Sequence, residues 1–110
     1  MLKAIIREAE WLAHESKDGH TFHLNWIADV EDENGEQIDL HARLGETIFM
    51  ATHCVDSNDD DEAWIWGTWW GDSSTPSFRR GEAGSLWEAQ SAAIAAGVEM
   101  AEHALRSGRV

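Results

Sequence analysis

The clearest periodic pattern of apolar residues lies in the last third of the chain. At about 100° per residue, a helix there collects five apolar side chains in one stripe: Trp87, Ile94, Val98, Ala101 and Leu105. Small residues widen this stripe along one flank: Ala89, Ala93, Ala96, Gly97 and Ala104. The opposite side is charged: Glu88, Glu99, Glu102 and Arg106. Small flanking residues let a helix lie close to its neighbour, and we expect that neighbour to be a sheet.

Capping residues mark both ends of this helix. Ser85 and Glu88 form a capping box, in which the serine oxygen accepts from the third helical N–H and the glutamate reaches back to the Ser85 N–H. No proline follows before Ser107, and Gly108 is the residue type that ends a helix. The sequence therefore predicts a helix that follows Ser85 and extends to Ser107.

Alternating apolar and polar residues predict antiparallel strands in the middle of the chain. The apolar positions recur at period two: Phe22, Leu24, Trp26, Ala28 and Val30, and then Ile38, Leu40, Ala42 and Leu44. A two-residue Asn34-Gly35 turn would place Val30 opposite Asp39. A three-residue loop over residues 33–35, with Gly35 left-handed, pairs Val30 with Ile38 and Ala28 with Leu40. The second register buries one consistent face, so we expect the bulged turn.

Two further strands are predicted over residues 47–55 and 63–70, joined by a polar hairpin loop over residues 56–62. The stretch from Gly71 to Gly84 holds the only proline and several glycine and serine residues, so we expect a loop there. Its Arg79-Arg80 pair is expected to form ion pairs with nearby acids.

The N-terminal segment supports two interpretations. Leu2, Ile5, Ile6, Ala9, Leu12 and Ala13 keep a helical spacing. However, Asp18-Gly19 is also a hairpin dipeptide, and a two-residue turn there pairs Trp11 with Trp26 and Ala13 with Leu24. Both alternatives stay open. In either case the elements predict an α+β fold: an antiparallel sheet of about four to five strands with one long C-terminal helix packed on one face.

Length and cysteine content fit one intracellular domain. The 110 residues are the size of a single domain, which we expect to span residues 1–110. Cys54 is the only cysteine, which excludes an intramolecular disulfide and fits a reducing compartment. No apolar run approaches the ~20 residues that span a bilayer. We therefore expect a cytoplasmic protein that does not associate with a membrane.

The chain is strongly acidic, with 21 Asp and Glu against 8 Lys and Arg and a formal charge of −13. A field of this sign repels phosphate, so it disfavours direct binding to nucleic acid or to an anionic membrane. It attracts a basic protein partner instead. The alternative, that the acidity serves only solubility, stays open at this point.

Catalytic and metal-binding motifs are missing from the sequence. It has no Gly-rich phosphate cradle, nucleophile elbow, CxxC or HExxH, so we expect neither an enzyme nor a cofactor. Asp56, Asn58 and Asp60 match three calcium-ligand positions of an EF-hand loop, but Asp61 and Gly67 stand where that loop needs Gly and Glu. The six histidines show no ligand spacing, and we expect His23, His41 and His53 to be solvent-facing residues of the sheet.

The most unusual segment is rich in tryptophan, in a chain with seven Trp and no Tyr. If residues 63–70 are extended, Trp64, Trp66, Thr68 and Trp70 share one face, and Ile65, Gly67 and Trp69 share the other. One face meets the C-terminal helix, and the other needs a second layer, a second copy or a partner. The candidate partner-binding residues are these indoles and an acidic rim: Trp64, Trp66, Trp69, Trp70, Asp59, Asp60, Asp61, Glu62 and Asp72. The competing hypothesis places all four indoles in the core.

Three hypotheses for function follow. The first is a non-catalytic protein-binding module that presents an acidic, nucleic-acid-mimicking surface to a basic partner. In size, charge and lack of motifs the chain resembles the small acidic inhibitors of phages and mobile elements, although no residue pattern carries that likeness. The second is a small-ligand or carbohydrate binder that uses the indoles as stacking platforms. The third is a structural protein whose Trp-rich strand forms a homodimer.

Overall fold

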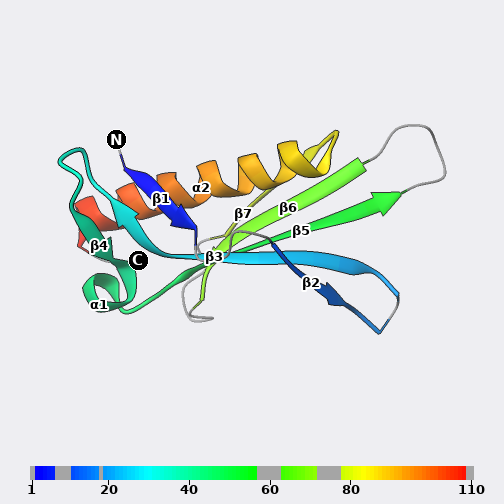
Figure 1. The fold of residues 1–110 in the computed structure, drawn as a ribbon, viewed down its shortest axis with the longest axis horizontal. Helices are drawn as coiled ribbons and strands as arrows, with labels where there is room; N and C mark the ends of the chain where they lie inside the picture. The colour runs from blue at the N-terminus through cyan, green and yellow to red at the C-terminus, as the bar shows by residue number, and fades with distance from the viewer. Residues whose placement is uncertain (1, 7–10, 18, 57–62, 72–77, 109–110) are drawn as a thin grey trace.

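Seven strands form one antiparallel sheet, and a long helix, α2 (Leu86–Ser107), lies along one face of it (Figure 1). The computed structural model describes residues 2–6, 11–17, 19–56, 63–71 and 78–108, with only the backbone of residues 55 and 56, and the statements below concern these residues. The main path of the sheet has five strands in the order β1-β3-β5-β6-β7. The predicted α+β fold, with its helix on one face of an antiparallel sheet, is confirmed.

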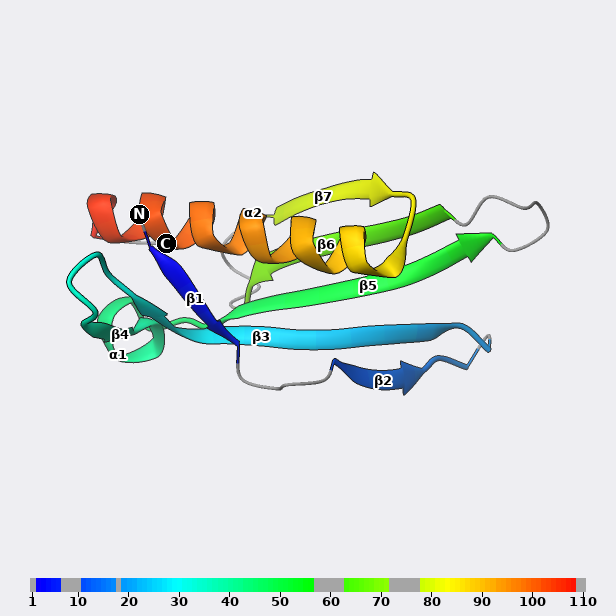
Figure 2. The same ribbon diagram turned by 45° about the horizontal axis from the view of Figure 1, so that its top comes forward.

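The strand β3 (Thr21–Glu31) organises the sheet because it is long enough to pair with two strands on each edge. One edge pairs with β1 (Lys3–Ile6) and β2 (Leu12–Glu15). The other edge pairs with β4 (Gln37–Asp39) and β5 (Ile48–Asp56). The strands β6 (Ala63–Trp70) and β7 (Phe78–Ala83) continue the sheet beyond β5 (Figure 2).

The turn between β3 and β4 has the predicted three-residue loop. Val30 pairs with Ile38, Gly35 is left-handed with φ 81°, and the Gly35 N–H donates to the Asp32 carbonyl at 3.1 Å. The predicted continuation of the strand through Leu40 is wrong, because the chain leaves the sheet there and forms α1 (Leu40–Leu44).

Local capping explains this change from strand to helix. The Asp39 carboxylate accepts from the Ala42 N–H at 3.1 Å, as an N-cap does, and Gly45 ends α1 in the left-handed conformation. Leu40 and Leu44 are four residues apart, so the period-two pattern also fits one side of a helix. Leu40 is fully buried by this arrangement.

The N-terminal segment forms strands in its described part, which resolves the open choice in favour of the hairpin. Its register differs by one residue from the predicted one: Leu12 pairs with Leu24, and Ala13 with His23. The predicted Trp11–Trp26 and Ala13–Leu24 pairs are therefore wrong. The reason is a three-residue loop like the one at Gly35, since Ser16 pairs with His20 through a 2.8 Å hydrogen bond and Gly19 has φ 82°.

The predicted strands over residues 47–55 and 63–70 are confirmed as β5 and β6, an antiparallel pair. The predicted loop from Gly71 to Gly84 is wrong at its C-terminal end, where β7 pairs with β6. The Arg79 guanidinium donates to the Glu99 carboxylate of α2 at 2.9 Å, so the predicted ion pairing is confirmed for Arg79.

Helix α2 begins and ends at its predicted capping residues. The Ser85 hydroxyl oxygen accepts from the Glu88 N–H at 3.1 Å, and Gly108 has φ 73°. The second half of the capping box differs from the prediction: the Glu88 carboxylate accepts from the N–H of Gly84, at 3.1 Å, rather than from that of Ser85.

The buried side of α2 is formed by the small residues rather than by the large apolar stripe. The fully or nearly buried residues of the helix are Ala89, Ala93, Ala96, Gly97, Met100, Ala101 and Ala104. Trp87, predicted in the stripe, is 75% exposed. A Cβ on Gly97 would lie 2.7 Å from the Ile27 side chain, so the helix backbone sits directly on the sheet. Because the helix lies so close to the sheet, its small residues face the sheet and Trp87 faces solvent.

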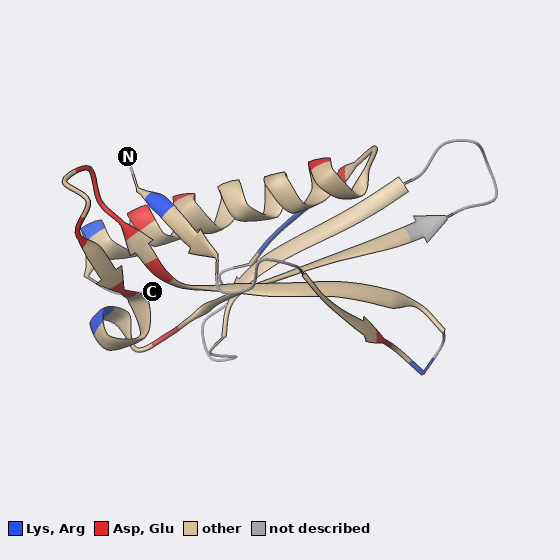
Figure 3. Cartoon of the chain, viewed as in Figure 1, with Lys and Arg blue, Asp and Glu red and all other residues tan. Residues whose placement is uncertain are grey.

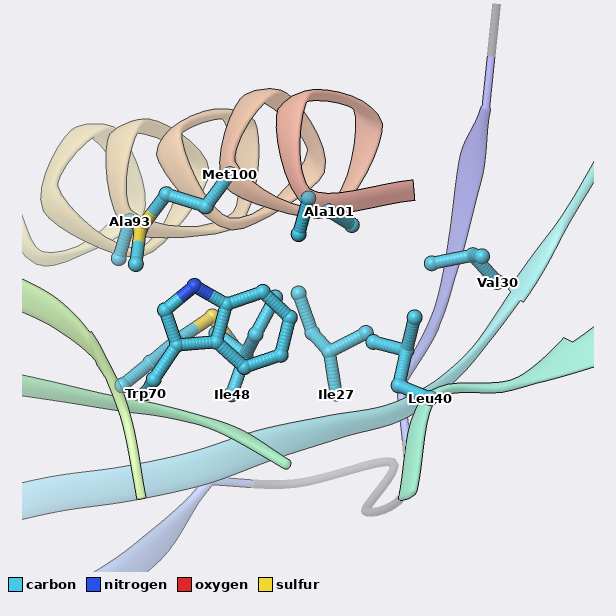
Figure 4. Close-up of a cluster of buried hydrophobic side chains, with 10 residues drawn as sticks. Ile27, Val30, Leu40, Ile48, Trp70, Ala93, Met100 and Ala101 are labelled. Atoms are coloured by element: carbon cyan, nitrogen blue, oxygen red, sulfur yellow. The ribbon is translucent and has the colours of Figure 1, made fainter. Parts of the chain in front are cut away.

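The core lies between α2 and the sheet. Figure 4 shows Ala93, Met100 and Ala101 of the helix facing Trp70, Ile48 and Ile27 of the sheet, with Val30 and Leu40 toward the C-terminal end of the helix. Ile27 and Val30 both join this cluster, although residues three positions apart in a regular strand point to opposite faces. The β1–β3 pairing has a bulge beside Ala28, between these two residues, and a bulge changes the side to which the following residues point.

Candidate binding face

The Trp-rich strand β6 is apolar on both sides, as the sequence predicts. On the helix side, Trp70 is 3% exposed, and the Thr68 hydroxyl donates to the Ala93 carbonyl of α2 at 2.8 Å. Trp66 and Trp64 alternate with them and are half-buried. The Trp66 indole lies over Gly81 of β7, where a Cβ would come within 2.8 Å of the ring. Of the four clustered indoles, Trp69 alone points to the face that α2 does not cover.

The strand pairing places three cross-strand rows on that uncovered side. The first runs along one end of the paired strands: His14, Phe22, His53, Ile65 and Glu82. The second is central: Leu12, Leu24, Ala51, Gly67 and Arg80. The third is fully aromatic: Trp26, Phe49, Trp69 and Phe78. We call these three rows the open face.

No described helix or strand packs over the open face. Helix α2 lies on the other side of the sheet, and α1 lies beside β4 at one end (Figures 1 and 2). Leu12, Phe49 and Phe78 are 48%, 39% and 55% exposed, and the tryptophans Trp26 and Trp69 are half-buried. This part of the chain therefore presents a broad apolar surface to solvent.

The aromatic rings on the open face lie close to one another. Ring centroids are 6.3 Å apart for Phe49 and Trp69, and 6.5 Å apart for Trp69 and Phe78. Gly67 leaves space beside this strip, and a Cβ on it would lie 3.5 Å from the Phe78 ring. Aromatic rings beside small residues offer flat contact surface with few hydrogen-bonding groups, which suits apolar contact with another molecule.

His53 adds one unusual polar group to the open face. Its ring stacks on Phe22 at 4.5 Å between centroids and meets the edge of His20 at 5.0 Å. Its Nε2 atom is buried and has no hydrogen-bond partner among the described residues. Burial and the nearby His20 lower the pKa of His53, so the neutral ring is favoured. The expectation of a solvent-facing histidine is therefore wrong for this ring nitrogen.

The other two histidines also depart from the expected positions. His41 is exposed, but it lies in α1 rather than in the sheet. His23 lies in β3 on the helix side and is half-buried, with its ring centroid 6.2 Å from that of Trp64.

The described carboxylates gather away from the open face. Five lie in or beside the β3–β4 turn, where Figure 3 shows the densest acidic stretch: Glu31, Asp32, Glu33, Glu36 and Asp39. Within the three rows, Glu82 is the only acid and Arg80 the only Lys or Arg. The predicted acidic rim, Asp59, Asp60, Asp61, Glu62 and Asp72, lies outside the described residues. The open face is thus nearly uncharged within an acidic chain.

A shallow depression of about 630 Å³ lies at the same end as the acidic turn. Its lining includes Leu2, Ile38 and Leu105 beside the carboxylate of Glu102. That carboxylate already accepts from the Leu2 N–H at 3.0 Å. This hydrogen bond joins the residue before β1 to α2, and the lining also includes Asp32, Glu33 and Arg106.

Sequence patterns located only part of the open face. Trp69 was predicted from alternation within its own strand, but the contributions of Phe49 and Phe78 were missed. The alternating pattern of residues 47–55 could have predicted the face of Phe49, which pairs with Trp69. No comparable signal exists for Phe78, because its strand was predicted as a loop.

The described residues contain no group of three or more His, Cys, Asp or Glu side chains placed to hold a metal ion. No described helix is long and apolar enough to cross a membrane. No protein-family model matches the sequence, and neither a curated protein nor a solved structure matches it. The chain's own surfaces are therefore the basis for an inference about function.

Proposed function

We propose that this chain is a non-catalytic binding protein that docks a partner protein on the open face. The observation that carries this proposal is the continuous aromatic row across four strands, which no described element covers. Contiguous apolar surface of this kind is rare on monomeric proteins and marks sites of interaction. Exposed Trp and Phe side chains supply most of the binding energy at such sites, because they bury large areas at low entropic cost.

The charge of the chain supports a basic partner. A formal charge of −13 draws a basic protein toward the molecule and repels nucleic acid. The acidic β3–β4 turn lies off the open face, so it steers and borders the contact rather than forming its centre. Such a protein would compete with nucleic acid for a basic surface, which is how a nucleic-acid mimic inhibits its target.

Two single-Trp variants test this proposal. Trp69→Ala removes an indole from the open face, whereas Trp87→Ala removes an exposed indole from the start of α2. Tagged wild-type protein and both variants are used to capture partners from a lysate of the native host. We expect wild type and Trp87→Ala to retain the same basic protein, and Trp69→Ala to lose it.

The salt dependence provides a second criterion. Steering by charge predicts that capture weakens as ionic strength rises, because exposed charges are screened. Equal capture by all three proteins would contradict the proposal, as would a captured partner that is acidic. Trp70 is unsuitable for this experiment, because its side chain belongs to the core and its removal would destabilise the fold.

A further inference from the structure

Strand β7 forms a continuous free edge of the sheet. It is the last strand in the sheet order, it pairs with β6 on one side, and no described strand pairs with its other side (Figure 2). The opposite edge of the sheet is divided into two short strands, β1 and β2, whose pairing with β3 ends at Ile6–Ile27 and begins again at Leu12–Leu24. Interrupted edges resist pairing with another chain, whereas a continuous edge offers unpaired backbone donors and acceptors.

Two opposite charges lie on this free edge. Arg80 and Glu82 are two positions apart, so both side chains lie on the open face, and both residues are exposed. Neither side chain forms a hydrogen bond or an ion pair with a described residue. Arg79 differs, because it points to the helix side and is held by Glu99. The edge thus carries one free cation and one free anion at a spacing that a second strand can match.

We infer that two copies of this chain pair through β7, antiparallel and about a twofold axis at Gly81. In this register Arg80 lies opposite Glu82 of the partner subunit, and by symmetry Glu82 lies opposite the partner subunit's Arg80. A twofold axis at Arg80 would place like charges opposite each other, and an axis at Glu82 would do the same. Charge complementarity therefore selects one register.

The surroundings of β7 leave room for this pairing. Helix α2 contacts β5 and β6 more than β7, so in the pair the two helices lie on the same side of the joined sheet, each over its own strands. Gly81 has no side chain at the axis. The strand carries two arginines and one glutamate, so it repels another chain of charge −13 less than an acidic strand would. The inference does not depend on the proposed function, and it places two open faces side by side.

Charge-swap variants test the inference by sedimentation velocity from micromolar to near-millimolar concentration. We expect wild type to form a dimer. Arg80→Glu and Glu82→Arg each turn two attractive pairs into two repulsive ones, so each should weaken the dimer by roughly tenfold or more. An equal mixture of these two variants should form a heterodimer of wild-type strength, because the charges are complementary again. The double variant Arg80→Glu/Glu82→Arg should also regain the dimer.

Two controls separate this contact from others. Arg43→Glu in α1 makes the same change in net charge away from β7 and should leave the dimer unchanged. Trp69→Ala should leave it unchanged as well. A monomer at all concentrations would overturn the inference. A dimer that Trp69→Ala dissociates and Arg80→Glu does not would also overturn it, and would place the contact on the open face.

Discussion

At the scale of single residues, His53 shows how an apolar sheet face can depend on pH. Its ring lies between Phe22 and His20, and its buried Nε2 atom has no described partner. Burial and His20 lower the pKa of His53 below the value of 6.5 that an unfolded chain would show. Between these two pKa values the unfolded state binds more protons than the folded state, so stability falls as the pH decreases.

The variant His53→Phe tests this dependence of stability on pH, because it keeps an aromatic ring stacked on Phe22 and removes the group that binds the proton. We expect wild-type stability to decrease from pH 7 to pH 5 more steeply than that of His53→Phe, measured by urea unfolding at each pH. His41→Phe, which removes an exposed imidazole from α1, should keep the wild-type slope. Parallel pH profiles for wild type and His53→Phe would show that His53 does not contribute.

Residue spacing predicted the turn at Gly35 and missed the similar one at Gly19. In the first case, two candidate registers buried different faces, so hydrophobic alternation could choose between them. In the second, the Asp18-Gly19 dipeptide favours a two-residue turn, and both registers bring apolar residues together. Leu12 opposite Leu24 and Trp11 opposite Trp26 are equally apolar pairs, so sequence alone could not decide.

At the scale of elements, the sequence identified α2 but not the side it buries. The caps at Ser85 and Gly108 act locally and are visible in the sequence. The buried side depends on how near the sheet comes, and Gly97 allows a contact closer than large side chains permit. Strand β7 and helix α1 were missed because each depends on context: pairing with β6 in one case, and the Asp39 cap competing with strand pairing in the other.

A buried hydrogen bond joins β6 to α2, and two buried threonines allow its contribution to stability to be measured. Thr68 donates to the Ala93 carbonyl, whereas the Thr52 hydroxyl is buried without a described partner. Thr68→Val should therefore lower the free energy of unfolding by ~1 kcal/mol. Thr52→Val should leave it unchanged or raise it slightly, because a buried hydroxyl without a partner is unfavourable. Urea unfolding of both variants measures the difference, and equal destabilisation would contradict the assignment of these two hydroxyls.

At the scale of the whole molecule, the fold class followed from the sequence because strands and helix have different apolar periods. The sequence predicted only part of the open face. Alternation within β6 predicted that both sides of the strand are apolar and that one meets the helix. Which aromatic residues of other strands join Trp69 depends on strand order and register, and these are set by long-range pairing that no local pattern encodes.

Helix α2 covers one face of the sheet, and no described element covers the other. Hydroxyl-radical footprinting of the native protein, read by mass spectrometry, measures this difference, because each side chain reports its own solvent access. We expect rapid labelling of Phe49, Trp69 and Phe78 on the open face, and protection of Met50 and Trp70 beneath α2. Protection of Trp69 and Phe49 equal to that of Trp70 would contradict this expectation, since the second face would then be covered.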